Sequence, residues 1–218
     1  MIEVKNLTKS YRTNTGRDYV FRNLSFTVPP DKSVALIGKN GAGKSTLMRM
    51  IAGLDMPDSG QIISTKSISW PVGLSGGFQG SLTGRQNAKF ICRVHGAEGD
   101  DMRGKVAFVE DFAEIGHYFD RPVKTYSSGM RARVAFGLSL AFDFDYYLVD
   151  EGMSVGDAHF KKKAADAFKN RVDGAKIILV THGMGQVKKL CDYVLLLDKG
   201  QVFPYEDVHE GIAAYMEL

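Results

Sequence analysis

The stretch Gly38-Lys39-Asn40-Gly41-Ala42-Gly43-Lys44-Ser45-Thr46 decides the fold of this chain. It matches the pattern G-x-x-x-x-G-K-[ST] at every defined position. Its glycines let the backbone curl so that successive N–H groups point at phosphate oxygens. An apolar run at residues 33–37 precedes it, and a helix predicted at about residues 44–52 follows, with its positive end towards the same anion. The stretch therefore predicts a nucleoside-triphosphate site between a buried parallel strand and a helix.

Two side chains of this loop have distinct expected roles. Lys44 brings a full positive charge to the β- and γ-phosphates, and the Ser45 hydroxyl is a candidate Mg²⁺ ligand. A chance glycine turn is the alternative interpretation. The strand before the loop and the helix after it argue against that alternative.

A second stretch, YYLVDE at residues 146–151, is an apolar strand that ends in two carboxylates. Neighbouring residues of a strand point in opposite directions, so Asp150 and Glu151 cannot share one role. We expect Asp150 to hold Mg²⁺ or its water shell. We expect Glu151 to polarise the water that attacks the γ-phosphate. Solvated acids at a strand end are common, but the phosphate-binding loop earlier in the chain favours the catalytic interpretation.

Apolar runs alternate with helical patterns, which predicts an α/β fold of the P-loop NTPase type with a mostly parallel sheet. Antiparallel strands are expected at the N-terminus, at residues 2–7 and 24–28. Further strands are expected at residues 33–37, 146–149, 176–181 and 193–197.

Residues 72–143 contain several helical patterns and no clear strand, although residues 67–83 look irregular. The helix from Thr83 is expected to place Ala88, Phe90, Ile91 and Val94 on one face. We therefore expect one domain over residues 1–218. Its catalytic part would lie at about 1–71 and 144–218, with an inserted helical subdomain at about 72–143.

The composition argues against some classes of protein. The 218 residues are 44% hydrophobic and 24% charged, which is ordinary for a soluble globular protein. The net charge of +3 does not by itself argue for nucleic-acid binding. Cys92 and Cys191 lack a CxxC companion, so we expect reduced thiols that pack as small apolar groups. No signal peptide opens the chain and no apolar run reaches the roughly 20 residues that a bilayer needs, so a cytoplasmic location is expected.

Further motifs surround these two stretches. KTYSSGMR at residues 124–131 resembles the signature motif of the ATP-binding cassette (ABC) family, usually spelled LSGGQ. Gln79 lies in a glycine-bordered loop between the other motifs, and SVGD at residues 154–157 resembles the family's D-loop. VTH at residues 180–182 resembles its switch-histidine motif. These features, together with Tyr11, occur in the family's order, so the resemblance covers essentially the whole chain.

The resemblance implies roles for these residues. Tyr11 would stack on adenine, Gln79 would help to hold Mg²⁺ and take part in catalysis, and His182 would steady the γ-phosphate. The remaining residues expected to bind ATP are Ser127, Ser128, Gly129, Met130 and Asp157. Plainer alternatives remain for several of them: a surface aromatic for Tyr11, a loop amide for Gln79 and a structural histidine for His182. Ser127 would be a good helix cap, which is compatible with anion binding at the same helix end.

In the resembled family two cassettes pair head to tail, and each signature caps the ATP that the other cassette holds. This chain has one phosphate-binding loop and one signature motif. The resemblance therefore implies a homodimer with two ATP molecules at its interface, with ATP and Mg²⁺ as the expected ligands. ATP would cross-link the subunits, and hydrolysis would remove the contact to the γ-phosphate.

The spelling YSSGM is similar to that of cassettes that export bacterial surface polysaccharides, namely capsule, O-antigen and teichoic acid. Residues 70–85 and 150–160 resemble the corresponding stretches of capsular polysaccharide exporters. The chain also ends near Leu218 without the carbohydrate-binding domain that O-antigen cassettes often carry. Export of capsular polysaccharide is therefore the expected function, with O-antigen, teichoic acid or drug export as alternatives. Cassettes that act in DNA repair or on ribosomes are a more distant alternative, and they usually carry coiled-coil insertions or a second cassette.

The resemblance also implies partners and a location. A transmembrane ABC-2-type permease would supply the pore and contact residues 75–94, and periplasmic and outer-membrane export proteins would be further partners. The chain would then be peripheral, on the cytoplasmic face of the bacterial inner membrane. Direct binding of the polysaccharide or of nucleic acid is not expected. The lysine run at residues 161–163 is interpreted as a solvated helix face.

Overall fold

The computed structural model describes residues 1–14, 16–73, 77–150, 157–172 and 174–218. The chain forms two compact units, and each is defined by the contacts among its own residues. The first unit contains Met1–Pro71, Phe144–Glu151 and Gly174–Leu218, and the second contains Val72–Asp143 and Gly152–Asp173. Glu151 and residues 154–156 of the expected D-loop lie outside the described residues.

The first unit is built on a six-stranded sheet in the order β5-β6-β7-β3-β8-β9. Neighbouring strands from β5 to β8 in this order run parallel, and β9 pairs antiparallel with β8. The predicted α/β fold with a mostly parallel sheet is therefore confirmed. The strands are β3 (Val34–Ile37), β5 (Ile68–Pro71), β6 (Tyr146–Asp150), β7 (Lys176–Val180), β8 (Tyr193–Asp198) and β9 (Gln201–Tyr205).

A three-stranded antiparallel sheet in the order β2-β1-β4 completes the strands of this unit. Its strands are β1 (Ile2–Thr13), β2 (Gly16–Val28) and β4 (Ser59–Ser64). The predicted antiparallel N-terminal strands are confirmed, although β1 and β2 extend into the polar stretch that separated them in the prediction. β4 was not predicted, because most of its residues are exposed and leave no apolar run to recognise.

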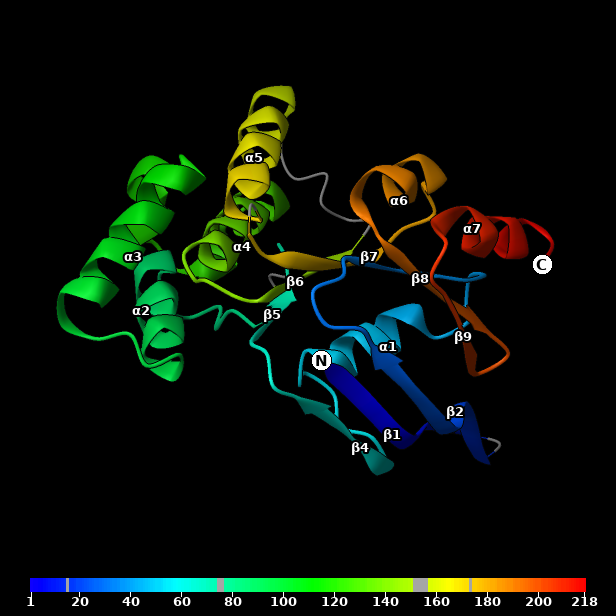
Figure 1. The fold of residues 1–218 in the computed structure, drawn as a ribbon. Coiled ribbons are helices and arrows are strands. Elements are labelled where there is room, and N and C mark those ends of the chain that lie inside the picture. The colour runs from blue at the N-terminus through cyan, green and yellow to red at the C-terminus, as the bar shows by residue number, and fades with distance from the viewer. Residues whose placement is uncertain (15, 74–76, 151–156, 173) are drawn as a thin grey trace. The chain divides into compact units, whose positions relative to one another are not determined.

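The core of the first unit lies on one face of the six-stranded sheet. Successive strand residues point to opposite faces, so Val34 and Leu36 of β3 share this face with Leu148 of β6. Helix α1 (Lys44–Ile51) and the three-stranded sheet cover it. Helices α6 (Met184–Leu190) and α7 (Val208–Met216) lie on the other side of the sheet from α1 (Figure 1).

The second unit is helical, as predicted for residues 72–143. Rings of Phe112, Phe136 and Phe160 pack in its core, with centroids 5.9 Å apart for Phe112–Phe136 and 5.4 Å apart for Phe112–Phe160. Phe160 lies on α5, so this helix belongs to the second unit, whereas the sequence placed it in the catalytic part. The helices are α2 (Gly84–Val94), α3 (Gly99–Ala113), α4 (Ser128–Leu140) and α5 (Ala158–Arg171), with 3-10 turns η1 (Gly116–Asp120) and η2 (Val123–Thr125).

The prediction that Ala88, Phe90, Ile91 and Val94 share one face of α2 is wrong. Ala88 is buried, but Phe90 is 58% exposed and Val94 is 65% exposed. At about 100° per residue, Phe90 lies roughly 200° around the helix from Ala88, so the two cannot share a face. The buried face instead contains Ala88, Cys92 and the polar Asn87.

Three further elements differ from the prediction. Residues 67–83 were expected to be irregular, but β5 pairs with β6 at the edge of the sheet. Helix α6 was not predicted. β9 was hidden by Pro204, which removes a backbone donor and is tolerated here because β9 is an edge strand. Among the described residues, no helix is long and apolar enough to cross a membrane.

Candidate nucleotide site

The order of the parallel strands brings three of the predicted site residues, Lys44, Asp150 and His182, to one edge of the sheet. Asp150 at the end of β6 is opposite Val180 of β7, and Val180 is opposite Leu36 of β3. The carboxyl ends of these strands therefore meet at one edge of the sheet, where ligands bind in open α/β folds. A hollow of about 320 Å³ opens there, lined by Val20, Asn40, Gly41, Gly43, Lys44, Ser45, Thr46, Asp150, Val180 and His182.

The loop at residues 38–43 has the conformation that its glycines permit. Gly41 and Gly43 have φ angles of 81° and 100°, in the region that side chains disfavour. A Cβ atom on Gly38 would lie 2.2 Å from the carbonyl oxygen of Leu197, so only glycine fits beside β8. Gly43 is the N-cap of α1 and makes no side-chain capping bond, so this helix end can accept an anion.

Lys44 lies inside the curve of this loop. Its ammonium donates to the carbonyl oxygens of Gly38 at 2.7 Å and of Lys39 at 2.9 Å. The residue is 7% exposed, so its charge is presented to the hollow rather than to bulk solvent. This placement suits a cation that binds phosphate oxygens.

Ser45 at the start of α1 and Asp150 at the end of β6 line the same hollow. Both supply oxygen atoms, the ligand type that Mg²⁺ prefers, so the residues present fit this ion. Gln79, the other expected ligand, belongs to the second unit. Among the described residues, no group of three or more His, Cys, Asp or Glu side chains forms a metal site.

His182 follows β7 in a turn fixed by its neighbours. The Gly183 N–H donates to Thr181 Oγ1 at 3.0 Å, and Thr181 Oγ1 donates to Gln186 Oε1 at 3.2 Å. The His182 ring lies with Nδ1 3.3 Å from the hydroxyl oxygen of Tyr215 on α7. The structure therefore brings His182 to the hollow that contains Lys44 and Asp150.

Tyr11 is not among the described residues that line this hollow. Its hydroxyl donates to Asp55 Oδ2 at 3.0 Å, and Lys9 Nζ lies 5.1 Å from the centre of its ring. Hydrogen bonds from Lys9 and then Tyr11 hold the pKa of the Asp55 carboxyl below its usual value. Val20 of β2 lines the hollow instead, against Gly43. Nothing local in the sequence distinguishes Val20 from the other apolar residues of β2.

Gln79 is held through its backbone in the second unit. The buried Asn87 accepts from the Gln79 N–H at 2.8 Å and donates to the Gln79 carbonyl oxygen at 3.1 Å. The same amide of Asn87 also donates to the Thr83 carbonyl at 2.9 Å. Asn87 was missed in the sequence. A polar side chain beside Ala88 on the buried face of an amphipathic helix is the signal that could have found it.

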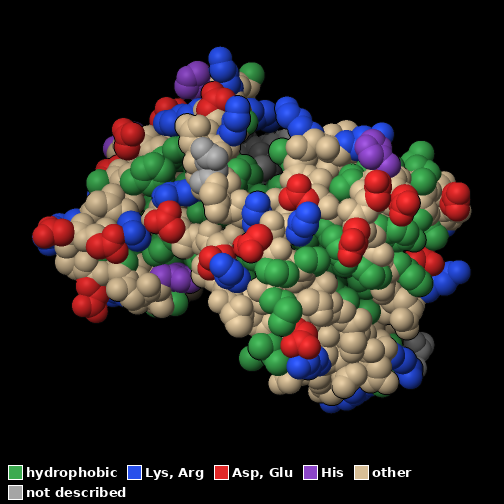
Figure 2. Space-filling model, viewed as in Figure 1, with side chains coloured by type: hydrophobic (Ala, Val, Ile, Leu, Met, Phe, Trp, Pro, Cys, Tyr) green, Lys and Arg blue, Asp and Glu red, His purple; other side chains and the backbone are tan. Residues whose placement is uncertain are grey.

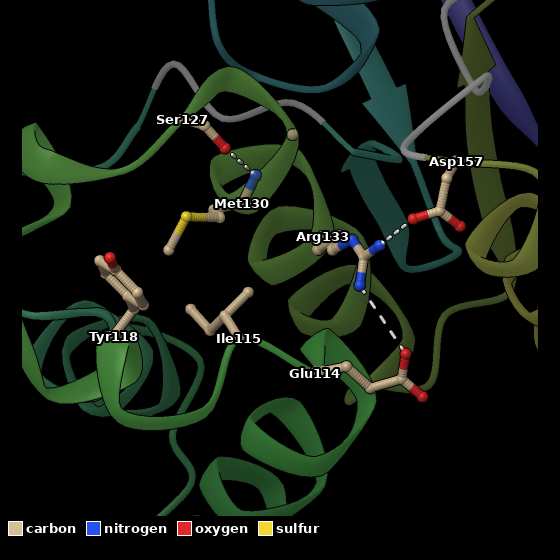
Figure 3. A pocket seen from close by; sticks show the side chains of 8 residues that line it. Glu114, Ile115, Tyr118, Ser127, Met130, Arg133 and Asp157 are labelled. Carbon is tan, nitrogen blue, oxygen red and sulfur yellow. Dashed lines mark hydrogen bonds and ion pairs between the residues drawn. The ribbon is translucent and has the colours of Figure 1, made fainter.

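The signature residues form the N-terminal end of α4. Ser127 is the N-cap, and its hydroxyl accepts from the Met130 N–H at 3.1 Å, so its capping role is present. Ser128 and Gly129 form the first turn of the helix. A hollow of about 440 Å³ lies beside them, and in Figure 3 the side chains of Ile115, Tyr118 and Met130 face it.

Arg133, one turn further along α4, connects this end to α5 (Figure 3). Its guanidinium donates to Asp157 Oδ2 at 2.6 Å and lies 3.7 Å from Glu114 Oε2. Asp157 caps α5 through a bond from the Phe160 N–H, which is the main reason why the pKa of its carboxyl is lowered. A bond from Lys163 likewise lowers the pKa of Glu114. Asp157 is thus engaged inside its own unit.

Comparisons with known proteins agree with this geometry. The polysialic acid transport ATP-binding protein KpsT of Escherichia coli is 56% identical over 99% of this chain and 96% of its own length. The capsule polysaccharide export ATP-binding protein CtrD of Neisseria meningitidis serogroup B is 45% identical over the full length of both chains. The teichoic acids export ATP-binding protein TagH of Bacillus anthracis is 37% identical over 95% of this chain and 38% of its own length.

Among solved structures, the ATP-binding cassette MJ0796, a dimer in a post-hydrolysis state with ADP and phosphate, has the same fold. It superposes with a TM-score of 0.72 at 23% identity and covers 94% of this chain and 98% of its own. The family profile described as ABC transporter matches residues 21–154, from β2 through the phosphate-binding loop and the signature helix to the carboxyl end of β6. With this match and the full-length relatives, the chain belongs to the ABC transporter family, as an ATP-hydrolysing cassette.

Proposed function

We propose that this chain is the ATPase subunit of an exporter of capsular polysaccharide. The observation that carries this proposal is its identity of 56% and 45% to the polysialic acid and capsule ATPases over nearly their whole lengths. The teichoic acid relative is 37% identical. The alternatives are export of O-antigen, teichoic acid or another cargo.

In this function the first unit holds the nucleotide. Lys44 and the loop N–H groups bind the phosphates, and Ser45 and Asp150, with Gln79 from the second unit, are the residues that would hold Mg²⁺. That ion, when bound, neutralises charge that develops on the β- and γ-phosphate oxygens. Glu151 is assigned from the sequence as the residue that polarises the attacking water. His182 donates a hydrogen bond to the γ-phosphate.

A second copy completes each site. The α4 end at Ser127–Met130 offers backbone N–H groups and the positive end of a helix, which suit a γ-phosphate held by the loop of the other copy. Since each chain has one loop and one signature motif, a head-to-tail pair makes two equivalent sites. The Tyr11 ring would stack on adenine, and in the structure its hydroxyl donates to Asp55.

The second unit transmits the nucleotide state to a membrane partner. Asn87 joins the Gln79 backbone to α2, so a shift of Gln79 on binding the ion would move this helix. Phe90 and Val94, one turn apart on the exposed face of α2, offer an apolar surface to a permease. The chain would then be peripheral on the cytoplasmic face of the inner membrane, with an ABC-2-type permease supplying the pore.

A role on nucleic acid has less support. The net charge is only +3, and in Figure 2 positive and negative side chains are interspersed on the face shown. A surface that tracks a phosphate backbone would instead collect Lys and Arg in one stripe.

The test is to inactivate this protein in its own cell and analyse each surface polymer. We expect the capsular polymer to be absent from the surface and to accumulate inside, and a plasmid copy to restore it. A copy with Lys44→Ala should not restore export. Normal capsule together with missing O-antigen or teichoic acid would replace the proposed cargo by that polymer.

A further inference from the structure

We propose that Tyr215 is a positioning residue for His182, because its hydroxyl fixes which ring nitrogen carries the proton. The inference rests on the proposed contact between His182 and the γ-phosphate. It assigns to α7, which no sequence motif connects with the nucleotide, a part in hydrolysis.

The contact with Nδ1 bears on the tautomer because the Tyr215 hydroxyl can donate to that nitrogen or accept from it, and we assign the hydroxyl as the donor. The Tyr215 hydroxyl oxygen lies 3.3 Å from Nδ1 of His182. When the hydroxyl donates to Nδ1, the neutral ring must carry its proton on Nε2. Nε2–H is then a hydrogen-bond donor, which is the form that a phosphate oxygen can accept. A ring with its proton on Nδ1 would present a lone pair at Nε2 and repel that oxygen.

The turn around His182 fixes the main chain but not the ring. The Thr181 hydroxyl accepts from the Gly183 N–H and donates to Gln186, which holds the backbone on both sides of His182. Rotation about the side-chain bonds of His182 is not restricted by those contacts. The Tyr215 hydroxyl therefore adds a constraint on ring orientation that this turn does not supply.

Helix α7, which carries Tyr215, is fixed at its first turn and against β8. Asp207 caps its first turn by accepting from the N–H groups of His209 and Glu210, at 2.6 and 3.1 Å. Gly211 packs directly on β8, where an added Cβ would lie 2.7 Å from Val194 Cβ. Tyr215 follows Gly211 by four residues and so lies on the same face of the helix.

A second contact links the end of this segment to the nucleotide loop. The Lys39 ammonium donates to the backbone carbonyl of Leu218. Residues on and just after α7 thus reach two parts of the nucleotide site, the switch histidine and the phosphate-binding loop. Helix α7 and the residues just after it are therefore placed to orient the switch histidine with respect to the loop.

The test uses Tyr215→Phe, which keeps the ring and removes the hydroxyl. We expect the ATPase kcat to fall by up to about tenfold, less than the 10²–10³ lost with a transition-state donor itself, while KM for ATP and the melting temperature change little. Tyr205→Phe, on β9 of the same unit, is the matched control and should behave like the wild type. An unchanged or increased kcat in Tyr215→Phe would overturn the inference.

Two further measurements separate this inference from the proposed role of His182. In ¹⁵N spectra of the histidine side chains, assigned with His182→Ala, the Nε2–H form of His182 should dominate in the wild type and decrease in Tyr215→Phe. In a His182→Ala background, Tyr215→Phe should cause no further loss of turnover. Normal turnover in His182→Ala would reject the role of His182. A large loss in His182→Ala with an unchanged tautomer in Tyr215→Phe would reject only the role of Tyr215.

Discussion

At the scale of single residues, the loop orients the ammonium group of Lys44 before any ligand binds. Two carbonyl oxygens of the loop accept from its ammonium, and the residue is almost fully buried. Replacing those carbonyl contacts by phosphate oxygens exchanges neutral acceptors for charged ones, which form the stronger hydrogen bonds. The side chain is thus already bent back over the loop before a triphosphate arrives.

Glu151 is the residue on which hydrolysis should depend most. Glu151→Gln keeps the size of the side chain but removes its ability to take a proton, so ATP binding should persist. Turnover should fall by about 10² to 10⁴, the usual contribution of a positioned base. Phosphate release and nucleotide binding, measured on the same sample, check this. Normal hydrolysis in the variant would show that another group activates the water.

Cys191 should be chemically inert in the folded protein. Burial raises the pKa of its thiol to about 12, and the residue is 8% exposed. The reactive thiolate is therefore scarce at pH 8, where an unfolded cysteine, with a pKa of about 8.5, is partly ionised. Labelling by iodoacetamide at pH 8 should be slow in buffer and fast in urea. Equal rates in both would contradict the buried environment.

At the scale of elements, the loop that contains Gln79 depends on α2. The Asn87 side chain accepts from the N–H of Gln79 and donates to its carbonyl oxygen, and Asn87 itself is 2% exposed. The capping box formed by Thr83 and Gln86 fixes where this helix begins. The Gln79 loop is therefore anchored to a defined position at the start of the helix.

Asn87→Ala should destabilise the protein by about 1–3 kcal/mol, because buried backbone groups lose their partner. It should also weaken the stimulation of ATPase activity by the permease, since Gln79 no longer moves with α2. Urea unfolding and ATPase assays with and without the membrane partner measure the two effects. Lys89→Ala, on an exposed position of the same helix, is the control for the unfolding measurement and should leave the midpoint unchanged. An unaltered unfolding midpoint in Asn87→Ala would contradict the anchoring role.

At the scale of the whole molecule, the phosphate-binding loop and the signature helix belong to different compact units. Each has a hollow of its own beside it. Pairing two copies head to tail would bring the loop of one to the signature of the other, and this arrangement has a sharp functional consequence.

Two inactive variants should restore activity when they are mixed. Lys44→Ala removes the loop's cation. Gly129→Asp puts a negative charge in the first turn of α4, where it suits the helix but repels a phosphate. A mixed dimer has one site built from the intact loop of one chain and the intact signature of the other. If the copies exchange freely, an equimolar mixture should recover about a quarter of wild-type ATPase activity. Sites contained within one chain would give no recovery.

The local motifs could be predicted because their chemistry depends on short spacings. The loop of residues 38–46, the strand that ends at Asp150 and the Ser127 cap each lie within one turn and its flanking element. The face of α2 was mispredicted because Ala88 and Phe90 were assigned to one face, although two residues span about 200° around a helix. Asn87 was missed because its partners lie in a loop with no regular pattern.

The sequence by itself determined the family, the loop assigned to phosphate binding and the residues assigned to hydrolysis, since each motif is a local arrangement of backbone and side-chain types. Only the tertiary structure decided which distant residues come into contact. The order β6-β7-β3 brings Asp150, His182 and the loop together across more than a hundred residues of chain. It also places Tyr215 against His182 and directs Tyr11 to Asp55. Such contacts arise from strand pairing and helix packing between distant segments, which local spacing does not specify.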